Sequence, residues 1–157
     1  MNILIDDFNC DQFIDVFKRA LLDLNKEKKV DLCSLIQEMN SQSDIWAILF
    51  VVNKRTIAFI QFQIVYLSND EFMERVGFIR EFWIEPQHRQ RGIGTKLLKD
   101  CEIHLSGLGI NQFILLSLPK AENFYKKQGY ILNENYISFN NLNIMTKNRF
   151  TSEKVSI

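Results

Sequence analysis

Cysteine and proline are scarce in this chain, and neither sign of charge is in excess. The three cysteines, Cys10, Cys33 and Cys101, are widely spaced and form no CxxC pair, which argues against a zinc ribbon or a thioredoxin-like site. Lysine plus arginine and aspartate plus glutamate both total 19. Nucleic-acid binding draws on a basic excess, so this balance argues against a nucleic-acid partner. We expect reduced thiols and no metal site.

Long hydrophobic runs are also missing. No stretch reaches the roughly 20 apolar residues of a membrane span. The first residues include Asp6, Asp7 and Asp11, where a signal peptide would need a basic start and an apolar run. We therefore expect a cytoplasmic protein without a membrane partner. The chain has 157 residues, 46% of them hydrophobic, which is enough for a core without disulfides, and we expect a single domain over 1–157.

Hydrophobic periodicity predicts strands and helices in alternation. Helices are expected at 11–26 with Asp11 as N-cap, at 31–40, at 92–106 and at 119–128. Strands are expected at 2–6, 45–52, 56–66, 76–84, 112–118, near 130–138 and at 142–148. This order predicts an α/β (α+β) fold, in which a mixed central sheet of about six or seven strands carries about four helices on both faces.

Residues 80–98, REFWIEPQHRQRGIGTKLL, combine a strand, a proline, a basic loop and a Gly-x-Gly that opens a helix. Gly92 and Gly94 would let the backbone come close to a ligand, and the first amides of a helix have no partners within it. The helix start therefore suits a phosphate, although an ordinary helix start with surface arginines would look the same. Side chains that would add charge or a hydroxyl donor are Arg89, Arg91 and Thr95. Leu97 excludes the GxGxxG fingerprint, and no P-loop is present.

This segment resembles the signature of the GNAT acetyltransferases. Residues 89–94, RQRGIG, match the family pattern [QR]-x-x-G-x-[GA], and residues 81–84, EFWI, resemble the family strand that precedes it. Downstream, residues 121–130, AENFYKKQGY, resemble the family helix and turn A-x-x-x-Y-x-x-x-G-F. The resemblance implies the GNAT fold and the transfer of an acyl group from acetyl-CoA to an amine.

The resemblance also assigns roles to residues that would hold acetyl-CoA. Those that would surround the CoA pyrophosphate are Arg89, Gln90, Arg91, Gly92, Ile93, Gly94 and Thr95. The pantetheine arm would pair with the backbone of Trp83 and Ile84, and the Ile84 amide would polarise the acetyl carbonyl. Asn123 and Phe124 would line the CoA channel. Many family members have asparagine where this chain has Leu118, so contacts to CoA near this position are expected to differ.

Two residues are candidates for proton transfer. Tyr125 matches the family tyrosine that protonates the departing thiolate, although a tyrosine packed against the sheet would occupy the same position. Glu81 is the candidate base that removes a proton from the substrate ammonium. It could instead only bind a cationic substrate, or pair with Arg80. Of the two histidines, His88 is expected to be a surface or CoA-contacting residue and His104 an exposed one.

The leading interpretation is an N-acyltransferase acting on a small-molecule or peptide amine. The alternative is a non-catalytic acyl-CoA-binding sensor or interaction module, and a toxin-like transferase acting on charged tRNA is a third reading. The acidic residues Asp70, Glu71 and Glu74 would suit a cationic amine, although a solvated acidic loop has the same composition. The sequence names no acceptor, and both a monomer and a homodimer agree with it.

Overall fold

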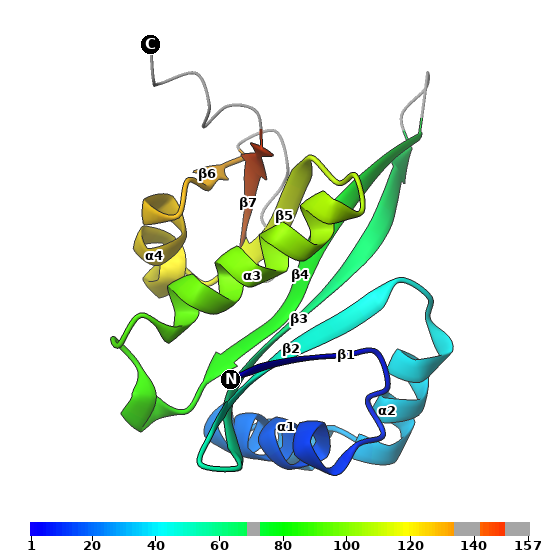
Figure 1. Ribbon diagram of the computed structural model, residues 1–157, viewed down its shortest axis with the longest axis vertical. Helices are drawn as coiled ribbons and strands as arrows, with labels where there is room; N and C mark the ends of the chain where they lie inside the picture. The colour runs from blue at the N-terminus through cyan, green and yellow to red at the C-terminus, as the bar shows by residue number, and fades with distance from the viewer. Residues whose placement is uncertain (69–72, 134–141, 150–157) are drawn as a thin grey trace. The chain divides into compact units, whose positions relative to one another are not determined.

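The computed structural model describes residues 1–68, 73–133 and 142–149 (Figure 1). The strands in these residues are β1 (Asn2–Ile5), β2 (Ile45–Val52), β3 (Arg55–Ser68), β4 (Met73–Ile84), β5 (Gln112–Ser117), β6 (Ile131–Leu132) and β7 (Asn143–Asn148). The α-helices are α1 (Asp11–Asp23), α2 (Leu32–Ser41), α3 (Ile93–Gly107) and α4 (Glu122–Lys127). Within the described residues, seven strands form one mixed sheet in the order β1-β2-β3-β4-β5-β7-β6, which confirms the predicted α/β (α+β) fold class.

The chain forms two compact units, which we describe separately. The first comprises residues 1–62 and 81–101, and the second comprises residues 63–80 and the chain from residue 102 onward. Strands β3 and β4 and helix α3 each contribute residues to both units. The expectation of a single domain over 1–157 stays a prediction.

In the first unit, α1 and α2 cover one face of the β1–β2 pair. The apolar residues of α1 recur every three or four positions, and the buried ones are Phe13, Val16, Phe17, Ala20 and Leu21. They pack with α2 and with the side of β2 that carries Ile45, Ala47, Leu49 and Val51. Burying each of the larger side chains stabilises the unit by about 1.5–3 kcal/mol. The apolar periodicity of α1 thus places its buried side chains in one packed cluster with α2 and β2.

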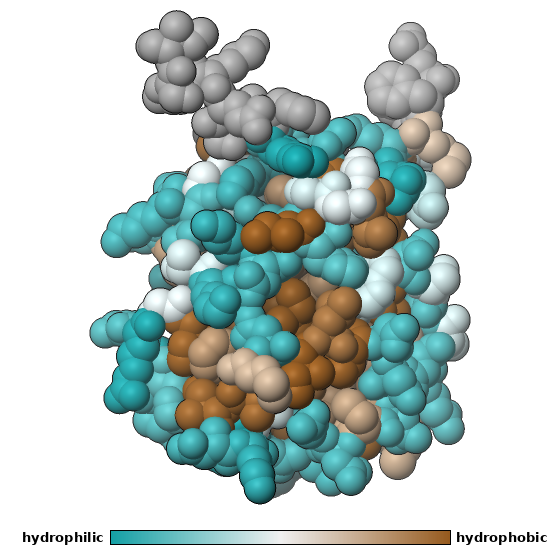
Figure 2. Space-filling view, viewed as in Figure 1, coloured by the Kyte–Doolittle hydropathy of each residue, from teal (hydrophilic) through white to brown (hydrophobic). Residues whose placement is uncertain are grey.

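The opposite face of β1 and β2 meets α3. Leu4 pairs with Ile48 and Asn2 with Phe50, so these four side chains share one side of the two strands. On that side the Asn2 amide hydrogen-bonds to Asp100 of α3. Figure 2 shows hydrophobic side chains gathered over β1 and β2 in this view, with hydrophilic residues around them. α3 therefore reaches this face at Asn2, while α1 and α2 pack on the other face.

In the second unit, parallel and antiparallel pairing meet at β5. Residues 77–79 of β4 pair with β5 in parallel, and β7 pairs antiparallel with β5 on its other side. A Cβ on Gly77 would approach the Leu105 side chain to 2.6 Å, so the absence of a side chain lets α3 pack against β4. β7, the last strand of the described residues, therefore lies between β5 and β6, an order that the sequence pattern did not predict.

The first helix differs from the prediction at both ends. It ends at Asp23 instead of residue 26, and Cys10 is the N-cap instead of Asp11. The φ of Asn25 is 55°, and a left-handed residue stops an α-helix because the next turn cannot continue the ladder. Two short 3₁₀ turns were not predicted: η1 (Glu27–Lys29) and η2 (Pro86–His88). A third, η3 (Pro119–Ala121), forms the first part of the helix predicted at 119–128 and leads directly into α4.

Other expectations concern termini and loops. Asn53 and Lys54 both have positive φ, so the connection between β2 and β3 is a two-residue hairpin turn. Residues 134–138 of the predicted strand near 130–138, and the acidic residues Asp70 and Glu71, lie outside the described residues. No helix in the part of the chain that the structure describes is both long and apolar enough to cross a membrane.

Candidate functional site

The predicted site residues fall into two groups. Residues 81–95 follow one another in the first unit, and residues 123–125 lie in the second. In the first group, β4 ends at Ile84 and α3 begins at Ile93. Between them, Gln90 and Gly92 have φ values of 62° and 81°. Two left-handed residues turn the chain sharply ahead of α3, and glycine adopts such a φ without steric strain.

The start of α3 is open on the side of Gly92. The first backbone bond of the helix runs from the Lys96 N–H to the Gly92 carbonyl, so the amides of Ile93 and Gly94 precede the helical ladder. A Cβ added to Gly92 would meet no heavy atom within 4 Å. Open space ahead of helix amides, at the positive end of a 15-residue helix, suits a phosphate group. Exposed residues beside this opening are Gln90, Arg91 and Thr95.

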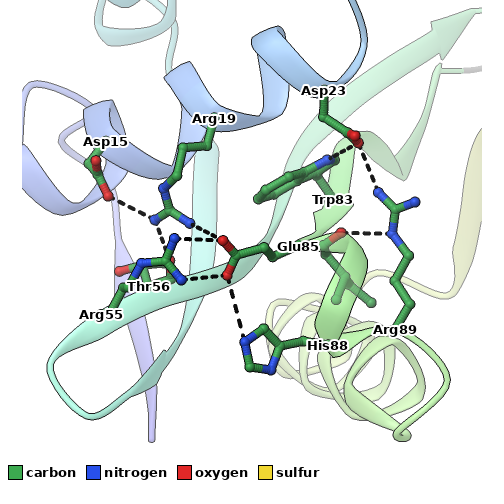
Figure 3. A network of polar contacts seen from close by, with 10 residues as sticks. Asp15, Arg19, Asp23, Arg55, Thr56, Trp83, Glu85, His88 and Arg89 are labelled. Carbon is green, nitrogen blue, oxygen red and sulfur yellow. Dashed lines mark hydrogen bonds and ion pairs between the residues drawn. The ribbon is translucent and has the colours of Figure 1, made fainter.

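The Arg89 side chain is bonded to α1 and to the end of β4 (Figure 3). Its Nε donates to the Ile84 carbonyl at 2.8 Å, and its Nη2 donates to the Asp23 carboxylate at 3.0 Å. The same Asp23 oxygen accepts a hydrogen bond from the Trp83 indole at 2.9 Å. No sequence pattern predicted these contacts, because Asp23 lies 66 positions before Arg89 and outside any motif. Phosphate binding by Arg89 stays a prediction.

Glu85, immediately after β4, is a buried carboxylate with three basic neighbours (Figure 3). Its side chain is only 8% exposed. Both Arg55 terminal nitrogens donate to it at 2.6 Å. Arg19 and His88 lie at 3.5 and 3.7 Å from its oxygens. Its own amide donates to the Ile57 carbonyl at 2.9 Å. Glu85 therefore connects the β2–β3 hairpin and α1 to the segment between β4 and α3, which contains Gly92.

Replacing Glu85 with glutamine is expected to lower the free energy of unfolding at pH 7 by about 2 kcal/mol. Removing one partner of a buried ion pair costs about 3–5 kcal/mol, and we place the effect lower because Arg55 is half exposed and water screens part of the interaction. Denaturant unfolding of the purified protein measures the difference. Glu27→Gln, at an exposed glutamate of η1, is the matched control and should leave stability unchanged.

The effect of this substitution should also depend on pH. Hydrogen bonds from Arg55 lower the pKa of Glu85 below its ordinary value of 4.5, against the opposing effect of burial. A carboxylate with a lowered pKa stabilises the fold fully above pH 4.5 and loses that contribution as the pH falls through the folded-state pKa. The stability difference between wild type and Glu85→Gln should therefore shrink in acid. A difference that stays constant would contradict this.

The remaining predicted residues of the first unit lie on β4. Glu81 is an exposed residue of β4, and its role as the base stays a prediction. Trp83 is buried against the core formed with α1 and α2. Ile84 is half buried, and its carbonyl is the one that accepts from Arg89. The backbone of the predicted oxyanion donor is therefore held by a side chain from the following loop.

In the second unit, Tyr125 is a buried residue of α4, with 9% of its surface exposed. Its ring packs edge-on against Phe124 and Tyr130, at centroid distances of 5.1 and 5.9 Å. Burial raises the pKa of Tyr125 to about 12, so the phenol stays protonated at neutral pH. Asn123, on the same helix, is exposed. Leu118, at the position of the usual family asparagine, is exposed as well.

A second set of polar contacts, formed by Glu102 and Lys147, holds Tyr130 in the turn after α4. The Tyr130 hydroxyl donates to Glu102 at 2.9 Å, and Lys147 donates to the same carboxylate at 2.8 Å. Lys147 passes so close to Gly129 that a Cβ there would meet its Cε at 3.3 Å. The Tyr130 amide donates to the Tyr125 carbonyl at 3.0 Å. The turn after α4 is therefore held by a glycine with a φ of 93° and by the partly buried carboxylate of Glu102.

The cysteine and histidine side chains of α3 are at least partly buried. Cys101 is fully buried in the core. His104 is half buried instead of exposed, and desolvation lowers its pKa. Among residues 1–68, 73–133 and 142–149, no three His, Cys, Asp or Glu side chains are grouped so that they could hold a metal ion.

Comparisons with known proteins agree with this arrangement. A family model described as the acetyltransferase (GNAT) family matches residues 5–130. No curated protein sequence matches the chain significantly. Among solved structures, the PaiA N-acetyltransferase of Thermoplasma acidophilum, in complex with coenzyme A, is similar with a TM-score of 0.69 at 18% identity, over 94% of this chain and 99% of that one.

Two further structures share the fold. A predicted acetyltransferase of Clostridium acetobutylicum, solved with acetyl-CoA, has a TM-score of 0.76 at 20% identity, over 89% of this chain and 95% of that one. An aminoglycoside acetyltransferase from an uncultured soil metagenomic sample, in complex with sisomicin, has a TM-score of 0.72 at 12% identity, over 88% and 93% of the two chains. At these identities the likeness establishes the shared fold.

Proposed function

Because the chain belongs to the acetyltransferase (GNAT) family, we propose that it transfers an acetyl or related acyl group from acetyl-CoA to a primary amine by direct attack. The observation that carries the proposal is the open helix start at Gly92. There a loop with two left-handed residues precedes the first amides of α3, which lie ahead of the helical hydrogen bonds and suit a phosphate. Arg91 and Thr95 are exposed beside it. Two of the structures with this fold were solved with CoA or acetyl-CoA, which supports the choice of ligand.

Each predicted residue has one task in this reaction. Acetyl-CoA supplies a thioester whose carbonyl carbon forms a bond to the amine nitrogen while the bond to sulfur breaks. The Ile84 amide donates to the carbonyl oxygen, on which negative charge develops. The Tyr125 hydroxyl donates its proton, or a hydrogen bond, to the leaving sulfur. Glu81 takes the proton that the substrate ammonium must lose. Trp83, Asn123 and Phe124 would contact the pantetheine arm.

A cationic acceptor is part of the proposal. Glu81 and Glu74 are exposed carboxylates of β4 and would attract an ammonium group. The structure solved with sisomicin, an aminoglycoside that carries several amines, offers an acceptor class to test first. A cytoplasmic location and a monomeric or homodimeric state are further parts of the proposal.

The test is thiol release from acetyl-CoA in the presence of sisomicin, spermidine or a lysine-containing peptide. Release that depends on one of these amines is the expected result. If the protein binds acetyl-CoA but releases no thiol with any amine, the non-catalytic acyl-CoA-binding module is favoured. With an active amine, Glu81→Gln should lose the acidic limb of the pH–rate profile, and an unchanged limb would remove Glu81 as the base.

A further inference from the structure

Three hydrogen bonds surround the end of β4 in the first unit (Figure 3). Asp23, the last residue of α1, accepts from the Trp83 indole at 2.9 Å and from Arg89 at 3.0 Å through one carboxylate oxygen. Arg89 then reaches the Ile84 carbonyl with its Nε at 2.8 Å. One carboxylate and one guanidinium therefore contact residues on both sides of the Ile84 amide.

The backbone after Ile84 is held on both of its polar groups. The peptide that joins Ile84 and Glu85 has its carbonyl bonded to Arg89 and its N–H bonded to the Ile57 carbonyl at 2.9 Å. The residue before Ile84 is held as well, because Trp83 is buried and its indole N–H is bonded to Asp23. The Ile84 amide thus has little freedom to rotate or shift.

Such restraint matters for an amide that polarises a carbonyl. A donor to a developing oxyanion acts through its fixed position, and a misplacement of about 1 Å can cost about 100-fold in rate. The Asp23–Arg89 ion pair contributes little to global stability by comparison, because both side chains are partly exposed, at 31% and 46%. Its effect on the position of the amide and its effect on folding can therefore be separated.

We propose that Asp23 and Arg89 are positioning residues, which hold the Ile84 amide in place to polarise the acetyl carbonyl. This inference rests on the proposed function and adds a role for Arg89 beyond phosphate binding. Two guanidinium donors, Nε and Nη2, which could otherwise hold an oxyanion in fork geometry, donate to the Ile84 carbonyl and to Asp23.

The experiment compares four variants with wild type: Asp23→Ala, Arg89→Lys, Arg89→Ala and Asp15→Ala. Asp23→Ala removes the shared acceptor, whereas Arg89→Lys keeps the positive charge but lacks the planar fork that reaches two acceptors at once. Asp15→Ala is the matched control, because Asp15 is an exposed carboxylate two turns earlier on α1 that pairs with Arg19. Each protein is mixed with acetyl-CoA labelled with ¹³C at the acetyl carbonyl, and the infrared stretch of the bound carbonyl is recorded.

We expect the carbonyl stretch to fall on binding to wild type and to Asp15→Ala. In Asp23→Ala and Arg89→Lys most of this fall should be lost, while the affinity for acetyl-CoA stays near wild type. The melting temperature should stay near wild type in Arg89→Lys and fall in Asp23→Ala, because the buried Trp83 indole loses its acceptor there. Turnover with the best amine should drop about 10- to 100-fold in both variants. The same drop in turnover is expected with acetyl-pantetheine as the acyl donor. Because this donor lacks the pyrophosphate, the drop cannot then come from a lost phosphate contact.

Two results would overturn the inference alone. One is a wild-type carbonyl shift in Asp23→Ala. The other is a pair of results: Arg89→Lys behaves as wild type, and Arg89→Ala binds acetyl-CoA weakly but acetyl-pantetheine normally. Arg89 would then be a phosphate contact only. A wild-type protein that binds no acetyl-CoA would instead overturn the proposed function, and the inference with it.

Discussion

Replacing Tyr125 with phenylalanine is expected to reduce kcat by about 100-fold, the usual size of a general-acid contribution. Phenylalanine keeps the ring that packs against Phe124 and Tyr130 and removes only the hydroxyl. In the described residues, no hydrogen bond to the Tyr125 hydroxyl is found, so its loss leaves no buried partner unsatisfied. Stability and affinity for CoA should therefore stay near wild type, and the effect should fall on the chemical step.

The pKa of Tyr125 adds a pH test to this prediction. Burial raises that pKa to about 12, so the phenol can donate throughout the neutral range. The wild-type rate should therefore show no alkaline loss from Tyr125 near neutral pH. Steady-state kinetics with an active amine, together with calorimetric titration of CoA, separate the effect on kcat from the effect on binding.

Tyr130→Phe is the matched control, because it removes a tyrosine hydroxyl from the same group of rings. That hydroxyl is bonded to Glu102, so its loss should lower the free energy of unfolding by about 1.5 kcal/mol and leave kcat nearly unchanged. Full activity of Tyr125→Phe would remove Tyr125 from the mechanism. Equal losses of kcat in both variants would point to packing of the rings instead of proton donation.

Replacing Gly92 with tryptophan is expected to weaken CoA binding by about 100-fold or more, which corresponds to about 2.8 kcal/mol. Nothing lies within 4 Å of a Cβ at this position, so the indole would project into the open space ahead of α3. A phosphate would then lose its approach to the helix amides. Calorimetric titration of wild type and variant with CoA gives the two dissociation constants.

The change at Gly92 also strains the backbone, and the control must carry the same strain. Gly109 has a φ of 85° and likewise has no heavy atom within 4 Å of an added Cβ, but it follows the other end of α3. Gly109→Trp should therefore lower the melting temperature by a similar amount, since a left-handed residue with a side chain costs about 1–2 kcal/mol, and should keep CoA affinity. Normal CoA binding by Gly92→Trp would exclude this helix start as the phosphate site.

Local sequence patterns were sufficient to predict most of the elements. β2 was predicted with its observed bounds, since a run of β-branched and aromatic residues ends at a turn that takes positive φ. The helix at 92–106 was predicted to within one residue, because glycines mark both ends. The end of α1 was wrong: apolar residues continue past Asp23, and only the left-handed Asn25 stops the helix.

The amino-acid sequence by itself determined the loop before α3, the helix of Tyr125 and the family to which the chain belongs. These features are local: a glycine needed for positive φ, a helix start and its flanking residues all lie within a few positions of one another. Motifs of this kind can be read without knowing the fold, and the family model covers both of them.

Only the tertiary structure decided which distant residues form ion pairs and hydrogen bonds. Glu85 is joined to Arg19 and Arg55, and Asp23 to Trp83 and Arg89, across 30 to 66 positions of sequence. Nothing in the neighbourhood of Asp23 distinguishes it from the exposed carboxylates of α1, because a pairing between distant residues depends on how α1 packs on the sheet. The order β5-β7-β6 has the same origin, since strand neighbours are chosen by packing and not by position in the chain.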